Sequence, residues 1–200
     1  MKRILLLLAA VCIGVAAHGQ SFELGFRAGS AVDLSCQVDA GLDAAWTREV
    51  ASGLDLGLGL GVRYARPLDQ RITTTRNGET TVSREYANDL GATAFGRLRY
   101  RFPGSLFLQA DAGYRVGMIN AKKHFAYADF VPTDVTGLYV EPQVGWRLDG
   151  RRSFALGVSL QQMKRGERIN VFTSSDTTSD TYKKITVWSP VAFVRYCLHW

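Results

Sequence analysis

The side chains best suited to nucleophilic chemistry are a histidine and three serines in the second half of the chain. His124 lies in one polar segment, and another polar segment holds Ser174, Ser175 and Ser179. A serine can cleave an ester when a neighbouring imidazole removes its hydroxyl proton. The serines or Glu141 could approach His124, but nothing in their spacing brings them together. A solvated loop histidine is the simpler interpretation, and we predict that the protein is not an enzyme.

Residues for other kinds of chemistry are equally scattered. His199 stands next to the last residue, and no group of His, Cys, Asp and Glu has the spacing of metal ligands. The glycines between Gly57 and Gly61 alternate with leucines, which is a strand pattern and not a phosphate-binding loop. The net charge of +6 includes no basic block of the kind that follows nucleic acid. We therefore predict no metal, no cofactor and no nucleic-acid partner.

The first nineteen residues have the pattern of a signal peptide. Two basic residues precede an apolar run from Ile4 to Ala17, and small residues end the segment at Gly19. The run is shorter than the roughly 20 residues that a membrane helix needs. We expect cleavage before Gln20, which makes residues 1–19 a signal peptide and residues 20–200 one domain. A buried N-terminal helix is the alternative.

Apolar and polar residues alternate along the remainder of the chain. Between residues 54 and 64 the even positions are all Leu, Val or Tyr, whereas the odd positions hold Asp55, glycines and Arg63. The same pattern recurs over residues 22–28, 38–46, 90–101, 106–118, 138–148, 154–160 and 185–200, and it weakens in the last of these. A period of two predicts strands with one apolar face. We therefore predict an all-β fold of eight antiparallel strands.

An apolar face on every strand fits two architectures. A soluble barrel turns that face inward, whereas a membrane barrel turns it toward lipid. The predicted strands, at about 9–13 residues, are long enough to cross a bilayer. The connections alternate between short turns (47–53, 102–105 and 149–152) and long polar segments (67–87, 120–134 and 164–183), as in outer-membrane barrels.

Aromatic residues support the membrane interpretation. They stand near the ends of the apolar faces, where an interfacial girdle is expected: Trp46, Tyr64, Tyr100, Tyr114, Trp146, Trp188 and Trp200. The pattern predicts an eight-stranded, up-and-down transmembrane β-barrel. A lipocalin-like soluble barrel is the alternative.

The end of the chain resembles the sorting signal of outer-membrane barrels. It closes on an aromatic residue, with apolar residues alternating before it: Val194, Tyr196, Leu198 and Trp200. With its glycine-rich strands, the chain as a whole resembles the small porin-like outer-membrane β-barrels common in Bacteroidetes. The resemblance implies the barrel fold, the outer membrane of a Gram-negative cell, and handling by the barrel-assembly machinery through the last strand. It implies no activity.

On this register the odd face turns charged side chains into the lumen. They are Glu23, Arg27, Asp39, Asp43, Asp55, Arg63, Arg97, Arg99, Arg101, Asp111, Arg115, Glu141 and Arg147. An eight-stranded barrel is barely wide enough for its own side chains, and buried charges persist when they are paired. We predict an Arg–carboxylate network that fills the interior, with glycines such as Gly59 and Gly145 leaving space for the arginines. A narrow pore that favours anions is the alternative, because arginines outnumber carboxylates in this set.

The long connections are the remaining candidates for function. Residues 71–84, with Asn77-Gly78 at their centre, predict a hairpin extension. Residues 170–182 mirror it, and Ile169 to Phe172 predict that the seventh strand continues beyond the membrane. Lys122 and Lys123 belong to a basic, aromatic patch that contacts lipopolysaccharide phosphates or serves as a generic interfacial anchor.

These features predict a structural or interaction role through the long loops. A surface protein is the partner that such loops suggest. A narrow anion-favouring pore and a lipid-A-modifying hydrolase are the alternatives. Cys36 and Cys197 fall near opposite ends of the predicted barrel, so we expect two free thiols.

Overall fold

A computed structural model describes residues 20–31, 36–76, 79–86, 88–120, 135–172 and 178–200. The predicted signal peptide, Lys122, Lys123, His124, Ser174 and Ser175 lie outside these residues. The strands are β1 (Gln20–Ala31), β2 (Cys36–Ala51), β3 (Leu54–Arg76), β4 (Glu79–Tyr86), β5 (Asp89–Arg101), β6 (Leu106–Asn120), β7 (Gly137–Arg147), β8 (Arg152–Phe172) and β9 (Thr178–His199).

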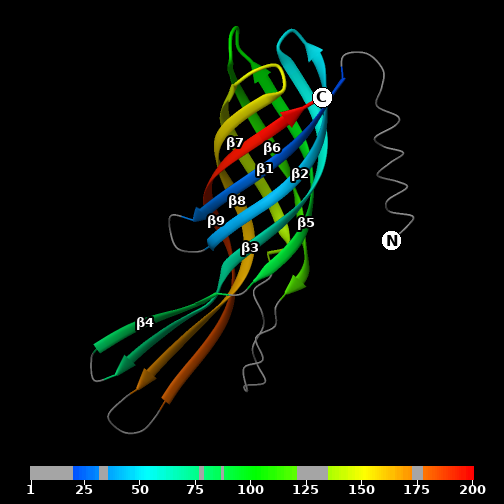
Figure 1. The fold of residues 1–200 in the computed structure, drawn as a ribbon. Coiled ribbons are helices and arrows are strands. Elements are labelled where there is room, and N and C mark those ends of the chain that lie inside the picture. The colour runs from blue at the N-terminus through cyan, green and yellow to red at the C-terminus, as the bar shows by residue number, and fades with distance from the viewer. Residues whose placement is uncertain (1–19, 32–35, 77–78, 87, 121–134, 173–177) are drawn as a thin grey trace.

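Eight of these strands close into one antiparallel barrel (Figure 1). The order around the wall is β2-β1-β9-β8-β7-β6-β5-β3, and the pairing of β2 with β3 closes it. β4 is not part of the wall, because it pairs with the far portion of β3. Among the described residues, no helix is long and apolar enough to span a membrane. The predicted all-β, eight-stranded fold is confirmed.

The barrel is inverted relative to a soluble protein. Even-numbered apolar side chains lie outside, with Leu58 66% and Leu60 55% exposed, whereas the odd-numbered Glu23 and Arg115 are fully buried. Among the described residues, buried polar and charged side chains outnumber buried apolar ones. A soluble barrel needs an apolar interior. The lipocalin-like alternative is therefore wrong, and the outer face suits hydrocarbon.

The two ends of the barrel differ in their connections. At one end, named here the turn end, consecutive strands are joined by residues 52–53, 102–105 and 148–151. The first of these turns is shorter than the predicted 47–53, because Thr47 still pairs within β2. Gly53 makes the tight reversal possible at a φ of 73°. A Cβ there would also lie 2.7 Å from the carbonyl oxygen of Arg101.

Two hairpins project from the opposite end, named here the loop end (lower left in Figure 1). β3 continues to Arg76 and turns back as β4, while β8 continues to Phe172 and pairs with the first part of β9. Both predicted extensions are confirmed. The far portions of β3 and β8 also pair in parallel, from Gln70↔Gly166 to Arg76↔Phe172. We call the resulting four-stranded arrangement, in the order β4-β3-β8-β9, the loop-end sheet.

The loop-end sheet brings together strands that are not neighbours in the wall. β3 and β8 are separated by β5, β6 and β7 on one side and by β2, β1 and β9 on the other. Their parallel pairing therefore bridges the loop end. Beneath it lies a small buried apolar cluster of Ala31, Cys36, Ala65 and Val191.

The two cysteines of the described chain are buried and free. Cys36 lies opposite Pro67 near the loop end, whereas Cys197 lies opposite Gly25 near the turn end. The predicted pair of free thiols is confirmed.

Candidate functional site

The lumen holds the charged side chains that the alternating pattern placed there, with two exceptions. The buried ones are Glu23, Arg27, Asp39, Asp43, Asp55, Arg63, Arg97, Arg99, Asp111, Arg115 and Glu141. Arg101 is half-buried and Arg147 is exposed. Each is the last residue of its strand, β5 or β7, so it lines the mouth of the turn end and not the enclosed lumen.

Glu23 organises the part of the lumen nearest the turn end. Its carboxylate accepts a hydrogen bond from Arg97 Nη1 at 2.6 Å and another from Arg99 Nη2 at 2.7 Å. Arg99 Nε also donates to Gln109 Oε1 at 2.8 Å. One carboxylate thus neutralises parts of two guanidinium groups that reach it from across the lumen. Charge-assisted bonds of this kind are the strong ones in a low-dielectric interior.

Asp111 is the second centre. Arg97 donates to it through Nε at 2.8 Å and Nη2 at 2.9 Å, and Arg195 Nη1 donates at 2.7 Å. Arg195 is also paired with Asp43. The sequence interpretation missed Arg195, because the odd face of the last strand looked apolar. Its odd number, in phase with the other lumen residues, was the signal that could have found it.

Glu141 holds the part of the network nearer the loop end. Arg63 binds it in a bidentate manner, with Nη1 at 2.6 Å and Nη2 at 2.8 Å, and Arg27 pairs with the same carboxylate. Arg27 also reaches Asp39 at 2.9 Å. Arg115 completes this side through Asp89, 2.9 Å from its Nη2.

Asp111 and Glu141 lie directly opposite each other on β6 and β7. Like charges in that position repel each other. Four arginines offset the repulsion: Arg97 and Arg195 on Asp111, and Arg27 and Arg63 on Glu141. This explains why so many arginines face the lumen.

The charges of the enclosed lumen are close to balance. Among the described residues, the buried arginines are Arg27, Arg63, Arg97, Arg99, Arg115 and Arg195. The buried carboxylates are Glu23, Asp39, Asp43, Asp55, Asp89, Asp111 and Glu141. The expected arginine excess is therefore absent from the enclosed part. A lumen of this composition carries no excess of positive charge that would select anions.

Aromatic rings fill the space between the charges. Arg27 lies 4.0 Å from the centre of the Phe193 ring, and Arg63 lies 4.4 Å from that of Tyr139. Arg97 and Arg99 lie similarly over Phe95 and Phe107. More of the lumen glycines leave space for aromatic rings than for arginine side chains, which corrects our expectation. A Cβ at Gly59 would enter the Phe95 ring, and one at Gly145 would enter the Phe107 ring.

One serine–histidine pair of the turn end was not singled out in the sequence. Ser153 Oγ lies 2.8 Å from His199 Nε2, and His199 Nδ1 lies 3.5 Å from Glu23 Oε1. The atoms follow the order of a Ser–His–acid triad. However, the charge of Glu23 is engaged by Arg97 and Arg99. Ser153 also lies within the wall, paired with Arg147 of β7 on one side and with Cys197 of β9 on the other.

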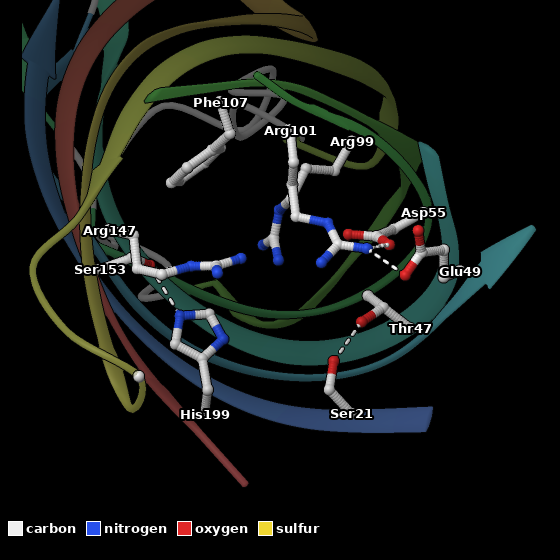
Figure 2. Close-up of a pocket in the computed structure, with 11 residues that line it drawn as sticks. Ser21, Thr47, Glu49, Asp55, Arg99, Arg101, Phe107, Arg147, Ser153 and His199 are labelled. Carbon is white, nitrogen blue, oxygen red and sulfur yellow. Dashed lines mark hydrogen bonds and ion pairs between the residues drawn. The ribbon is translucent and has the colours of Figure 1, made fainter. Parts of the chain in front are cut away.

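The mouth of the turn end contains a cavity of about 310 Å³ (Figure 2). It is lined by Ser21, Thr47, Glu49, Asp55, Arg99, Arg101, Phe107, Arg147, Gly150, Ser153 and His199. Arg101 Nη2 bridges Glu49 at 2.7 Å and Asp55 at 2.8 Å. On the rim, Asp149 accepts hydrogen bonds from Arg152 and from the Arg151 amide, which hold the pKa of its carboxyl below the usual range.

Metal chemistry has no support among the described residues. No three of their His, Cys, Asp and Glu side chains come together in a way that could hold an ion.

Comparison with known proteins identifies the architecture. No protein-family profile and no curated protein sequence matches the chain. Among solved structures, it is similar to the outer membrane protein OprG from Pseudomonas aeruginosa, with a TM-score of 0.53 and 14% identity over 91% of this chain and 96% of that one. A structure from the de novo design of transmembrane β-barrels matches with a TM-score of 0.42 and 10% identity, over 90% of this chain and 95% of that one. The chain thus has the fold of OprG, a closed eight-stranded antiparallel barrel of the outer-membrane type.

Proposed function

We propose that this chain is an integral outer-membrane protein of a Gram-negative cell, that its lumen is a structural plug, and that it works as an interaction barrel through its loop end. The filled lumen is the observation that carries the proposal. An apolar outer surface and an outer-membrane type of fold support the location. In this orientation the turn end faces the periplasm and the loop-end sheet faces the outside. The signal peptide of residues 1–19 and the origin in Bacteroidetes remain predictions.

The plug follows from the cost of opening it. A path for solute along the axis would separate pairs such as Arg63–Glu141 and Arg97–Glu23, whose side chains are almost wholly buried and belong to strands that are not adjacent in the wall. Separating one buried ion pair costs about 3–5 kcal/mol, because each charge is left uncompensated. Several such pairs cross the lumen from opposite walls, so their costs accumulate.

A plugged lumen predicts that the protein carries no ionic current across a planar bilayer. Protein that migrates as a folded barrel on an unboiled gel should give no conductance steps, while an open porin in the same membrane conducts. Discrete anion-favouring steps that shrink when Arg97 and Arg99 are changed to Gln would establish the narrow pore and remove the plug.

The loop-end sheet supports the interaction role. Within the described part of the chain β4 pairs only with β3, and its residues from Glu79 to Arg84 are all exposed. An exposed strand edge offers unpaired amide and carbonyl groups to another strand. Six of the eight residues of β4 are polar or charged, so its edge suits backbone pairing more than apolar docking. The partner that fits is a surface protein with an edge strand of its own.

Proline substitutions at two adjacent positions test this pairing. Thr81→Pro and Val82→Pro each remove one amide, and in a strand adjacent amides point to opposite sides. A photo-crosslinker at Ser83 on intact cells should give discrete adducts. We expect the proline at the outward-facing amide to abolish them and the other proline to retain them. Both variants should keep the gel shift of the barrel, because β4 lies outside the wall. Identical adducts in both variants would contradict edge pairing.

The barrel-assembly machinery and lipopolysaccharide are the other proposed partners. Val194 on the outer face of β9 and Trp200 just after it are 44% and 64% exposed. β9 also closes the wall against β1, as Leu24↔Leu198 shows. Both observations support recognition of the last strand by the barrel-assembly machinery. Lys122 and Lys123 remain a proposed contact with lipopolysaccharide, and no catalytic role is proposed for Ser153 or His199.

A further inference from the structure

The cavity at the turn end is built differently from the lumen behind it. Its floor is the paired network, because Arg99 on its wall is bound to Glu23 and Gln109. A second cavity of about 330 Å³ adjoins it and shares Glu49, Arg101, Phe107 and Arg147. Together they form a vestibule at the barrel mouth, beside the short turns.

Arg147 is the charged residue of this vestibule that has no ion-pair partner among the described residues. Among the described residues its guanidinium takes part in no ion pair, although Glu49 and Asp55 line the same cavity. Both of those carboxylates are engaged by Arg101. Figure 2 shows the Arg147 guanidinium pointing toward the middle of the mouth, the direction in which Arg99 and Arg101 also point. Of the three arginines that line this cavity, Arg99 is paired with Glu23 and Arg101 with Glu49 and Asp55, so Arg147 is the one left without a counter-charge among the described residues.

The vestibule has further donors at suitable places. The Nε of Arg101 has no hydrogen-bond partner among the described residues. The hydroxyls of Ser21 and Thr47 form one pair at 2.7 Å on the opposite wall. Guanidinium groups bind carboxylates and phosphates through planar, charge-assisted pairs. A ligand of this cavity must be small, because about 310 Å³ is near the lower limit for small-molecule sites.

We infer that the turn end binds a small oxyanion, a molecule with a phosphate or carboxylate group, through Arg147 with help from Arg101. In the orientation proposed above, the site opens to the periplasm. The oxyanion balances the positive charge of Arg147 and does not pass through the lumen. The inference stands apart from the interaction role, since the loop-end sheet lies at the other end of the barrel.

Titration of the folded, isotope-labelled protein in detergent micelles tests the site. Inorganic phosphate and glutarate are the probes, each added against sodium chloride of equal ionic strength. Gly53, Gly104 and Gly150 line the vestibule and their amides report binding, whereas the amide of Gly91, near the loop-end start of β5, serves as the reference. We expect saturable shifts at the three turn glycines and none at Gly91. Tighter binding of phosphate assigns a phosphate ligand, and tighter binding of glutarate assigns a carboxylate.

Variants of two arginines locate the binding group. Arg147→Gln should weaken binding by about tenfold or more, because the charged fork is lost. Arg151→Gln removes an equal charge from the same end but not from the cavity, so binding should change by less than about twofold. Arg147→Lys keeps the charge without the fork and should fall between them. No saturable shift in the wild type, or equal losses for Arg147→Gln and Arg151→Gln, would overturn the site.

Discussion

An arginine at Leu60 is expected to lower the free energy of unfolding from a phospholipid bilayer by about 2–4 kcal/mol. Leu60 is on the outer face of β3, 55% exposed, opposite Ala44 of β2 and Ala94 of β5. It stands near the middle of the portion of β3 that belongs to the wall. A charge there must leave water for hydrocarbon. Urea titration in vesicles, followed by the gel shift between folded and unfolded protein, measures the loss.

The same substitution at Val82 is the matched control. Val82 is also apolar and exposed, but it lies on β4, beyond the barrel wall. Val82→Arg should change the free energy of unfolding by less than about 0.5 kcal/mol, as ordinary surface substitutions do. If Leu60→Arg were equally neutral, the outer face of the barrel would be in water, and the membrane assignment would fail.

Changing Glu141 to Gln should cost about 3–5 kcal/mol of stability, because it leaves Arg63 and Arg27 facing each other without their shared carboxylate. Gln has nearly the same shape, so the loss reports charge and not packing. Arg27 keeps Asp39, but Arg63 loses both of its bonds to the Glu141 carboxylate. The same vesicle titration measures this change.

Glu49→Gln provides the comparison for that variant. Glu49 also pairs with an arginine, Arg101, but its side chain is 46% exposed at the mouth. An exposed pair contributes about 0–1 kcal/mol. Losses of similar size for Glu49→Gln and Glu141→Gln would mean that water reaches the lumen, and the plug would have to be abandoned.

Much of this architecture follows from the period-two pattern. The run from Leu54 to Tyr64 has its leucines outside and Arg63 inside, as its alternation predicts. The hairpin of β3 and β4 was expected because the sequence between them is Asn-Gly, a dipeptide typical of tight turns. These features depend on neighbours in sequence or in the ladder, and such neighbours are visible in a single chain.

The alternating pattern could not predict which side chains pair with each other inside the lumen. Arg27 of β1 meets Glu141 of β7, and these strands are not adjacent in the wall. Which side chains meet across a barrel depends on strand tilt and stagger, which alternation does not encode. Phe193 weakens the alternation of the last strand by placing an apolar residue on its lumen face, and its ring packs beneath Arg27. The parallel pairing of β3 with β8 was not predicted for the same reason.

That parallel pairing has a consequence for how the molecule is assembled. The backbone of Ile72 in β3 pairs with that of Arg168 in β8, and these two residues are distant in sequence and belong to separate hairpins. In the orientation proposed above, this pairing forms only after both hairpins have crossed the membrane, and its loop-closure cost is larger than that of either hairpin. We therefore expect the loop-end sheet to form last, after the wall of the barrel. Until it forms, β3 and β8 are connected only through the other strands of the wall.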